Sequence, residues 1–376
     1  MNHPDRTPEL VIDLSVVIAA YRALARALPE VDLYYALKCN GSRPVLAALR
    51  EAGCGFEIAS ATEIDDLLAI DVNPANVLYS NPVKPVRHIA QAYAAGVRQF
   101  AFDSEDELTK LAAAAPGSLV TVRLAAHGIG SDVPSEGKFG VDAEAAAALL
   151  LAARELDLVP YGIAFHVGSQ MMRPEAWRAP LRVVGEVMAK LAADNVFLEL
   201  VNLGGGFPVR YDVPPPPLAE YGAVIAEGLA ALPYPVRAVA EPGRALVAEA
   251  GTLVTTVIGT ALRSGQRWVH LDVGAFNGLM ESLETGNRLR FPVRDSRRSS
   301  ERELCHLTGP TCDSQDTILF DVPLSVGLAV GDQVYVGCAG AYTTVYASTF
   351  NGFQVPEIRC VSGSLRSLSG RRARTI

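Results

Sequence analysis

The chain has 376 residues and a formal net charge of −8, and 49% of its residues are hydrophobic while 20% are charged. This balance is typical of a folded globular protein and excludes an intrinsically disordered one, and the length predicts two domains. Because a protein that binds the phosphate backbone needs a basic surface, the acidic charge argues against nucleic acid as a partner.

Short apolar runs alternate with longer stretches in which apolar residues recur every three or four positions, as they do in helices. The runs begin at Leu33, Gly55, Asn76, Arg98, Leu119, Tyr161, Phe197 and Arg237. Eight strands that alternate with helices indicate the α/β class and a (β/α)₈ TIM barrel. We expect this barrel domain to occupy residues 10–245.

After Gly251 the sequence changes to short β-branched runs separated by Gly, Pro and Asp. Examples are TLVTTVIGTAL, RWVHLDVG, DTILFDVPL and GDQVYVGCAGAYTTVYAS. Such runs are typical of strands, so residues 246–376 are predicted to form a mostly-β domain, with which residues 1–14 could pair.

The six cysteines have no CxxC spacing, and the N-terminal segment lacks the apolar core of a signal peptide. We therefore expect a cytoplasmic protein, and no metal site is predicted. No apolar run approaches the roughly 20 residues of a membrane helix, so no membrane association is expected.

Polar or small residues end each of the eight predicted barrel strands. They are Lys38, Ser60, Asn81, Asp103, Arg123, His166, Gly204 to Gly206, and Glu241. Because the carboxyl ends of barrel strands meet at one mouth, where TIM barrels carry their chemistry, these residues are predicted to lie together.

Lys38 ends a predicted buried strand in YYALKCN. Desolvation lowers the pKa of a lysine, and a neutral amine can form a Schiff base with an aldehyde cofactor. A lysine that extends from a strand end into water explains the same position, and this feature alone favours that interpretation.

NLGGGFP at 202–208 and EPGR at 241–244 follow the seventh and eighth predicted strands, where many TIM barrels bind phosphate. Backbone N–H groups of three glycines can surround an anion, and Arg244 can add a charged fork. Glycine runs are usually turns, but this position favours a phosphate site.

Glu241 at the mouth could hold a pyridine nitrogen protonated, which makes the ring an electron sink. An ion pair with Arg244 or Arg123 is the alternative. His166 could pack flat on a cofactor, although a core histidine is more often structural.

In GPTCDSQD, Cys312 could donate a proton beside Asp313, or it could be one more buried thiol. Tyr342, in a glycine turn, could bind a phosphate oxygen.

Together these strings resemble the fold-type III pyridoxal-phosphate decarboxylases, the alanine-racemase-like family that includes ornithine, diaminopimelate and arginine decarboxylases. The resemblance is closest to the bacterial ornithine decarboxylase branch and spans about Leu33 to Phe353. It is carried by YYALKCN, FDSEDEL, KFG at 138–140, FHVGSQ, NLGGGFP, EPGR, GPTCDSQD and GAYTTVYASTFNGF.

The resemblance implies that pyridoxal 5′-phosphate (PLP) is the cofactor, that Lys38 joins its aldehyde, that His166 stacks on its ring and that Glu241 pairs with its nitrogen. Further implied cofactor contacts are Glu57, Arg123, Ser169, Gly205, Gly206, Gly243, Arg244 and Tyr342. Implied substrate contacts are Glu281, Cys312, Asp313 and Phe350. In family members the cysteine comes from the partner subunit, so a homodimer is implied.

The leading hypothesis is decarboxylation of L-ornithine to putrescine, with Asp313 and Glu281 as carboxylates for the distal ammonium. Glu281 stands where the eukaryotic enzymes have Asp, so lysine or another diamino acid remains an alternative. Diaminopimelate is disfavoured, because that branch typically has CES where this chain has CDS. A non-catalytic binder of the antizyme-inhibitor kind is disfavoured because Lys38, Glu241 and Cys312 are all present.

Overall fold

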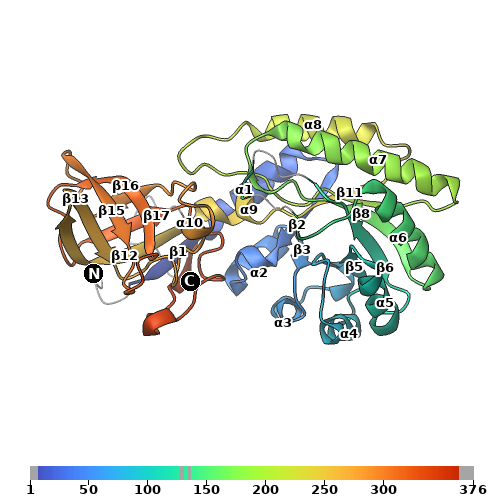
Figure 1. Cartoon of the computed structure of the whole chain (residues 1–376), viewed down its shortest axis with the longest axis horizontal. Coiled ribbons are helices and arrows are strands. Elements are labelled where there is room, and N and C mark those ends of the chain that lie inside the picture. Colours follow the sequence, from blue (N-terminus) through green and yellow to red (C-terminus); the bar gives the residue numbers. More distant parts are fainter. Residues whose placement is uncertain (1–6, 127–130, 134–136, 364–376) are drawn as a thin grey trace. The chain divides into compact units, whose positions relative to one another are not determined.

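The computed structural model describes residues 7–126, 131–133 and 137–363 (Figure 1). It divides into two compact units. The barrel unit contains Ala20–Pro208 and Pro215–Gly243. Among the described residues, the β unit contains 7–19, Val209–Pro214 and 244–363. In the described part, no helix is both long and apolar enough to cross a membrane.

The barrel unit contains a closed parallel barrel, which confirms the predicted fold class. Its strands are β2 (Val31–Ala36), β3 (Gly55–Ile58), β4 (Val77–Tyr79), β5 (Gln99–Phe102), β6 (Leu119–Arg123), β8 (Val159–Ala164), β10 (Leu200–Asn202) and β11 (Arg237–Ala240). Each of the eight predicted runs overlaps one of them, although β2 and β8 each begin two residues before the predicted run. Parallel pairing places all their carboxyl ends at one rim.

Helices surround these strands (Figure 1). They are α2 (Arg43–Glu51), α3 (Thr62–Leu68), α4 (Val86–Ala95), α5 (Glu105–Ala114), α6 (Ala143–Glu155), α7 (Arg178–Ala193) and α8 (Leu218–Ala230), and α1 (Leu14–Ala27) precedes β2. Local sequence explains where they begin. Ser104 caps α5 by accepting a hydrogen bond from the Glu107 N–H, and Asp142 caps α6 by accepting one from the Ala145 N–H.

Inside the barrel, side chains of alternate residues fill the interior, as in other barrels of this size. Tyr34, Leu78, Leu200 and Val239 form one buried cluster from four strands. The interior is therefore a packed core, and functional groups are confined to its ends. A two-stranded antiparallel sheet of β7 (Ser131–Val133) and β9 (Ser169–Met171) lies outside the barrel sheet.

The β unit contains an eight-stranded mixed sheet. Its strands are β1 (Glu9–Asp13), β12 (Gly251–Arg263), β13 (Gln266–Leu271), β14 (Val293–Asp295), β15 (Arg302–Thr308), β16 (Thr317–Ser325), β17 (Gln333–Gly337) and β18 (Glu357–Val361). The short helices α9 (Arg244–Val247) and α10 (Glu281–Glu284) belong to the same unit. β1 pairs antiparallel with β12 and parallel with β18, so the first described segment of the chain joins this sheet.

In the predicted β run GDQVYVGCAGAYTTVYAS, the strand β17 ends at Gly337. Cys338 and Tyr342 have φ values of 55° and 56°. A left-handed residue cannot continue a β-strand, so the chain turns here instead. This turn places Tyr342 in a loop, and the structure adds β14, β15 and β18 to the runs named from the sequence.

Candidate active site

The mouth of the barrel contains an ion pair between Lys38 and Glu57. Lys38 follows β2 in a short 3₁₀ turn, and Glu57 lies in the neighbouring strand β3. The Lys38 Nζ donates a hydrogen bond of 2.9 Å to Glu57 Oε2, and the lysine side chain is 47% exposed while that of Glu57 is 1% exposed. The pairing of these adjacent strands therefore presents an amine at the mouth.

The protonation state of Lys38 differs from the expectation that burial would leave it neutral. Burial lowers its pKa, but Glu57 and Glu241 outweigh burial, and the pKa is raised above the usual lysine value. The difference is due to the buried carboxylate of Glu57 on the neighbouring strand, which pairs with Lys38. Burial in turn raises the pKa of Glu57, an effect that Lys38 only partly offsets.

Glu57 has one oxygen without a partner. Its Oε1 is buried and accepts no hydrogen bond from the residues that the structure describes. A buried carboxylate oxygen that accepts nothing is costly, and such an oxygen at a mouth suits a ligand that brings a donor. Glu57 therefore has one oxygen for Lys38 and one for a ligand.

Glu241 follows β11, and the residues that hold it were not predicted. Ser80 Oγ, just after β4, and Asn202 Nδ2, at the end of β10, both donate to Glu241 Oε1, the latter at 2.6 Å. The sequence pointed to Asn81 instead of Ser80, but Asn81 Nδ2 donates to the Ala59 carbonyl at 3.3 Å. Two donors on one oxygen fix the position of the carboxylate.

His166 lies two residues beyond β8, and its ring is neutral. The Gly205 N–H donates to His166 Nδ1 at 3.1 Å, so this nitrogen accepts and the proton must be on Nε2. Burial, together with the positive charges of Arg123 and Lys38, lowers the pKa of His166 to about 3. A flat uncharged ring at the mouth is suited to packing against another ring.

This depressed pKa predicts acid sensitivity. An unfolded histidine titrates near 6.5, so the stability that depends on a neutral His166 is complete above about pH 6.5 and is lost as the pH falls towards the folded value. We expect the difference in melting temperature between wild type and His166→Phe to narrow as the pH falls from 6.5 to 4. A difference that stays constant over this range would contradict a neutral, buried His166.

The glycine run Gly204 to Gly206 is required by packing. A Cβ on Gly204, which has φ +65°, would lie 2.2 Å from the Phe165 carbonyl oxygen, and one on Gly206, which has φ +105°, would lie 2.4 Å from that of Gly168. Two of the three N–H groups already donate within the protein. The Gly204 N–H donates to Asn202 Oδ1, and the Gly205 N–H donates to His166 Nδ1. A ring of three free donors, as the sequence suggested, is therefore not formed.

Other predicted residues of the barrel unit lie near the same strand ends. Arg123 is the last residue of β6; burial lowers the pKa of its guanidinium, while Glu241 and Asp103 oppose that change. Ser169 begins β9, and Gly243 follows β11, where a Cβ would lie 2.9 Å from that of Cys39.

In the β unit, Arg244 and Glu281 form a buried bidentate ion pair. Arg244 Nη1 lies 2.8 Å from Glu281 Oε2, and its Nη2 donates to Oε1. Nη1 also donates to the Tyr211 hydroxyl at 2.6 Å, and the guanidinium lies 5.1 Å from the ring centre of Tyr342. The sequence had assigned Arg244 and Glu281 to different groups, whereas the structure joins them.

Cys312 is exposed, which excludes the interpretation that it is a buried structural thiol. Its Sγ lies 3.7 Å from Asn351 Oδ1, beside Phe350, which is 43% exposed and packs on Phe276 with ring centres 5.1 Å apart. Asp313 is also exposed, and its Oδ1 accepts a hydrogen bond from the Gln315 N–H at 2.8 Å. These residues form one exposed, partly aromatic face of the β unit.

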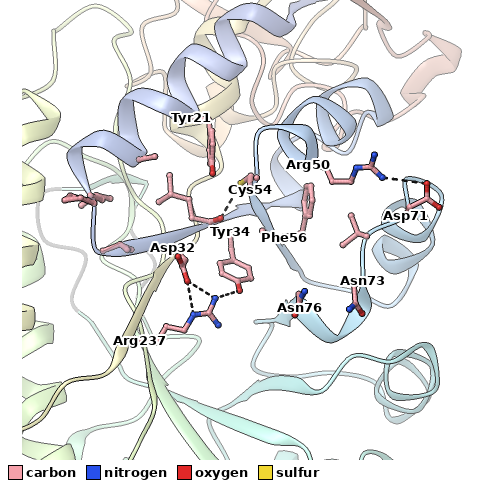
Figure 2. A pocket seen from close by; sticks show the side chains of 18 residues that line it. Tyr21, Asp32, Tyr34, Arg50, Cys54, Phe56, Asp71, Asn73, Asn76 and Arg237 are labelled. Carbon is pink, nitrogen blue, oxygen red and sulfur yellow. Dashed lines mark hydrogen bonds and ion pairs between the residues drawn. The ribbon is translucent and has the colours of Figure 1, made fainter.

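A cavity of about 650 Å³ lies at the other end of the barrel, where β2, β3 and β11 begin (Figure 2). Its charged residues face one another. Arg237 Nε donates to Asp32 at 2.8 Å and Nη2 donates to the Tyr34 hydroxyl at 2.7 Å, while Arg50 lies 3.7 Å from Asp71 (Figure 2). These pairs satisfy the charges within the protein, and TIM barrels carry their active sites at the carboxyl ends of the strands, so the carboxyl-end mouth is the candidate active site.

Comparison with known proteins identifies the family. The family model described as "Pyridoxal-dependent decarboxylase, pyridoxal binding domain" matches residues 14–248. The chain belongs to the pyridoxal-dependent decarboxylases. Its resemblance to this family, its class as a carboxy-lyase and its cofactor, pyridoxal phosphate, are thereby confirmed.

Several relatives of this decarboxylase cover nearly all of it. It is 35% identical to the lysine/ornithine decarboxylase of Selenomonas ruminantium over 92% of this chain and 88% of that relative. A crystal structure described as that of an SrLDC mutant in complex with PLP matches with a TM-score of 0.89 and 33% identity. The match covers 96% of this chain and 94% of that chain. Lysine/ornithine decarboxylase from Vibrio vulnificus matches in complexes with putrescine (TM-score 0.86, 33% identity, 94% of each chain) and cadaverine (0.88, 32%, 95% of each).

The residues at the mouth of this decarboxylase fit pyridoxal phosphate. The cofactor brings an aldehyde, which suits the lysine at the mouth, and a ring nitrogen, which suits the carboxyl group of Glu241. Glu57 Oε1 accepts no hydrogen bond from the described residues, and the cofactor brings a donor for it. The fit therefore depends on contacts of this chain as well as on its family.

Proposed function

We propose that this decarboxylase removes the α-carboxyl group of a basic L-amino acid, and that L-ornithine, which yields putrescine, is its preferred substrate. The observation that carries the proposal is the presence at one mouth of the Lys38–Glu57 pair and the anchored Glu241. Relatives named lysine/ornithine decarboxylase, with structures that contain putrescine or cadaverine, support a diamino acid as substrate.

When bound, pyridoxal phosphate supplies a ring that accepts the electron pair left by departing CO₂. Lys38 would hold the cofactor covalently, and Glu241 would hold a proton on its ring nitrogen. His166 would pack its neutral ring on the cofactor, and Glu57 orients Lys38. The proposed remaining cofactor contacts are Arg123, Ser169, Gly205, Gly206, Gly243, Arg244 and Tyr342.

The proposed phosphate contacts differ from a simple glycine cradle. Because Gly204 and Gly205 already donate within the protein, Gly206 is the glycine of this run that we assign to the phosphate. Arg244 has five N–H donors, so it can hold a phosphate oxygen while it remains paired with Glu281. Tyr342 would add its hydroxyl group.

We assign substrate contacts to the exposed face of the β unit. Cys312 returns a proton to the carbon that lost CO₂, and Asp313 binds the distal ammonium. Phe350 contributes apolar surface beside Cys312. Glu281 adds negative charge, although Arg244 already engages both of its oxygens.

We propose a homodimer, since the resemblance implies that Cys312 serves the site of a partner subunit. Exposed apolar side chains of the β unit, including Leu262 at 77% and Leu304 at 57%, support a protein interface. Sedimentation at twice the mass of the chain is the test.

The cytoplasmic location stays a prediction, with which six free thiols agree.

The substrate assignment predicts an order of turnover. We expect kcat/KM for L-ornithine to exceed that for L-lysine by roughly tenfold or more, because one methylene in a pocket changes binding by about 1–3 kcal/mol. L-Arginine and diaminopimelate should be turned over more slowly than either. Release of CO₂ from the four amino acids measures this, with Lys38→Ala as the blank.

Lysine turnover above ornithine turnover would contradict the preferred substrate but leave the reaction intact. Absence of CO₂ release from all four amino acids would contradict the proposed function as a whole.

A further inference from the structure

Lys84 is a buried lysine that the proposed chemistry does not use. It lies in the segment SNPVKP between β4 and α4, and its side chain is 0% exposed. A buried ammonium is costly unless every donor is satisfied, so its surroundings require an explanation.

The Lys84 ammonium joins three elements of the barrel unit. Its Nζ donates to the Asn81 carbonyl at 2.8 Å and to the Ala101 carbonyl at 2.6 Å, and it lies 2.9 Å from Glu107 Oε1. Asn81 follows β4, Ala101 lies in β5 and Glu107 lies in α5. All three donors of the ammonium are thus used, one on each element.

Glu107 balances the charge. Its side chain is 1% exposed, and it also accepts the Lys84 backbone N–H at 3.2 Å and an ion pair from Lys110. Burial lowers the pKa of Lys84 to about 8, with Glu107 opposing the change. Lys110 is 27% exposed and can therefore reach water, whereas Lys84 cannot.

The segment that Lys84 holds leads directly to Glu241. Asn81, whose carbonyl accepts from Lys84, is adjacent to Ser80, whose hydroxyl donates to Glu241 Oε1. Strand β4 has only three residues, and beyond it the Ser80 N–H bonds to the Ile58 carbonyl at 3.1 Å. The Ser80 backbone is thus held through its N–H by Ile58, and the next residue, Asn81, is held through its carbonyl by Lys84. Together these two hydrogen bonds fix the segment that presents the Ser80 hydroxyl.

We infer that Lys84 is a positioning residue for the decarboxylase, because its ammonium fixes Ser80–Asn81 so that the Ser80 hydroxyl holds Glu241 at the cofactor ring. This inference rests on the proposed role of Glu241. A merely structural ion pair would alter stability but would not act on the cofactor through Ser80.

The test is the dissociation constant of PLP for Lys84→Met, which keeps the length of the side chain and removes the amine. We expect an increase of about tenfold, comparable to that of Ser80→Ala, because the hydrogen bond from the Ser80 hydroxyl to the charged Glu241 is lost in both. The visible absorbance of bound cofactor should change its pH dependence in the same direction in both variants.

Lys110→Met is the matched control, since Lys110 contacts the same Glu107 and the Lys84 carbonyl but not Asn81. It should bind PLP as wild type does. Because Lys84→Met leaves a buried carboxylate, the variant Lys84→Met/Glu107→Gln removes both charges and keeps an acceptor for the Lys84 N–H. It should recover stability and still bind PLP about tenfold more weakly.

The double variant Lys84→Met/Ser80→Ala distinguishes positioning from a general effect. If Lys84 acts through Ser80, the PLP dissociation constant of the double variant equals the larger of the two single-variant dissociation constants. If the two effects multiply, to about a hundredfold, Lys84 acts independently of Ser80 and the inference is overturned.

The outcomes for Lys84 and for the proposed function are separable. Wild type that binds PLP and releases CO₂, with Lys84→Met indistinguishable from Lys110→Met, overturns the positioning role alone. Wild type that binds no PLP overturns the proposed function instead.

Discussion

The Lys38→Ala variant is expected to lose the visible absorbance of bound cofactor and to release CO₂ at least about 10³-fold more slowly than wild type, a loss typical of removing a covalent catalytic group. Lys38 is the amine at the mouth that Glu57 orients at 2.9 Å. Without it, the aldehyde has no covalent attachment, and the cofactor is retained only by its weaker contacts. Absorbance after dialysis and single-turnover CO₂ release measure both effects.

The fold should survive this change. Lys38 is half-exposed, and burial raises the pKa of Glu57, so the carboxyl group can take up a proton when its partner is removed. The matched control is Lys190→Ala, which breaks an exposed ion pair with Glu144 on the helical surface and should leave activity unchanged. A Lys38→Ala protein that keeps both its absorbance and its turnover would show that the amine of another residue holds the cofactor.

Glu241→Gln is expected to keep the cofactor but to lower kcat at least about a hundredfold, within the usual range for losing a group that controls a catalytic proton. Glutamine can still accept hydrogen bonds from Ser80 and Asn202 at the same oxygen position. It lacks the negative charge that keeps a proton on the ring nitrogen, so the ring becomes a weaker electron sink. Rapid mixing with substrate measures the chemical step.

The companion variant Glu199→Gln changes an exposed carboxylate of the same unit and should have wild-type rates. Because Glu241→Gln should retain visible absorbance while Lys38→Ala loses it, the two variants separate cofactor attachment from ring protonation. Equal kcat for wild type and Glu241→Gln would show that another group holds the ring proton.

Much of the barrel and its mouth could be predicted from the sequence. Each predicted barrel run overlaps a strand, because apolar runs bounded by Gly, Pro and polar residues depend on local chemistry. The location of Lys38, His166 and Glu241 at one rim followed from topology, since closed parallel strands place their carboxyl ends together. Family resemblance supplied chemical roles that the residue pattern alone left open.

The partners of these residues depended on the tertiary structure. Ser80 and Asn81 are adjacent and equally polar, yet successive residues of an extended chain point in different directions, so only Ser80 reaches Glu241. The pairs Lys84–Glu107 and Arg244–Glu281 join residues that are 23 and 37 positions apart. Local patterns determine which segments become strands and which end carries polar groups, but strand register and packing determine which side chains meet, because a hydrogen bond requires an approach within about 3 Å.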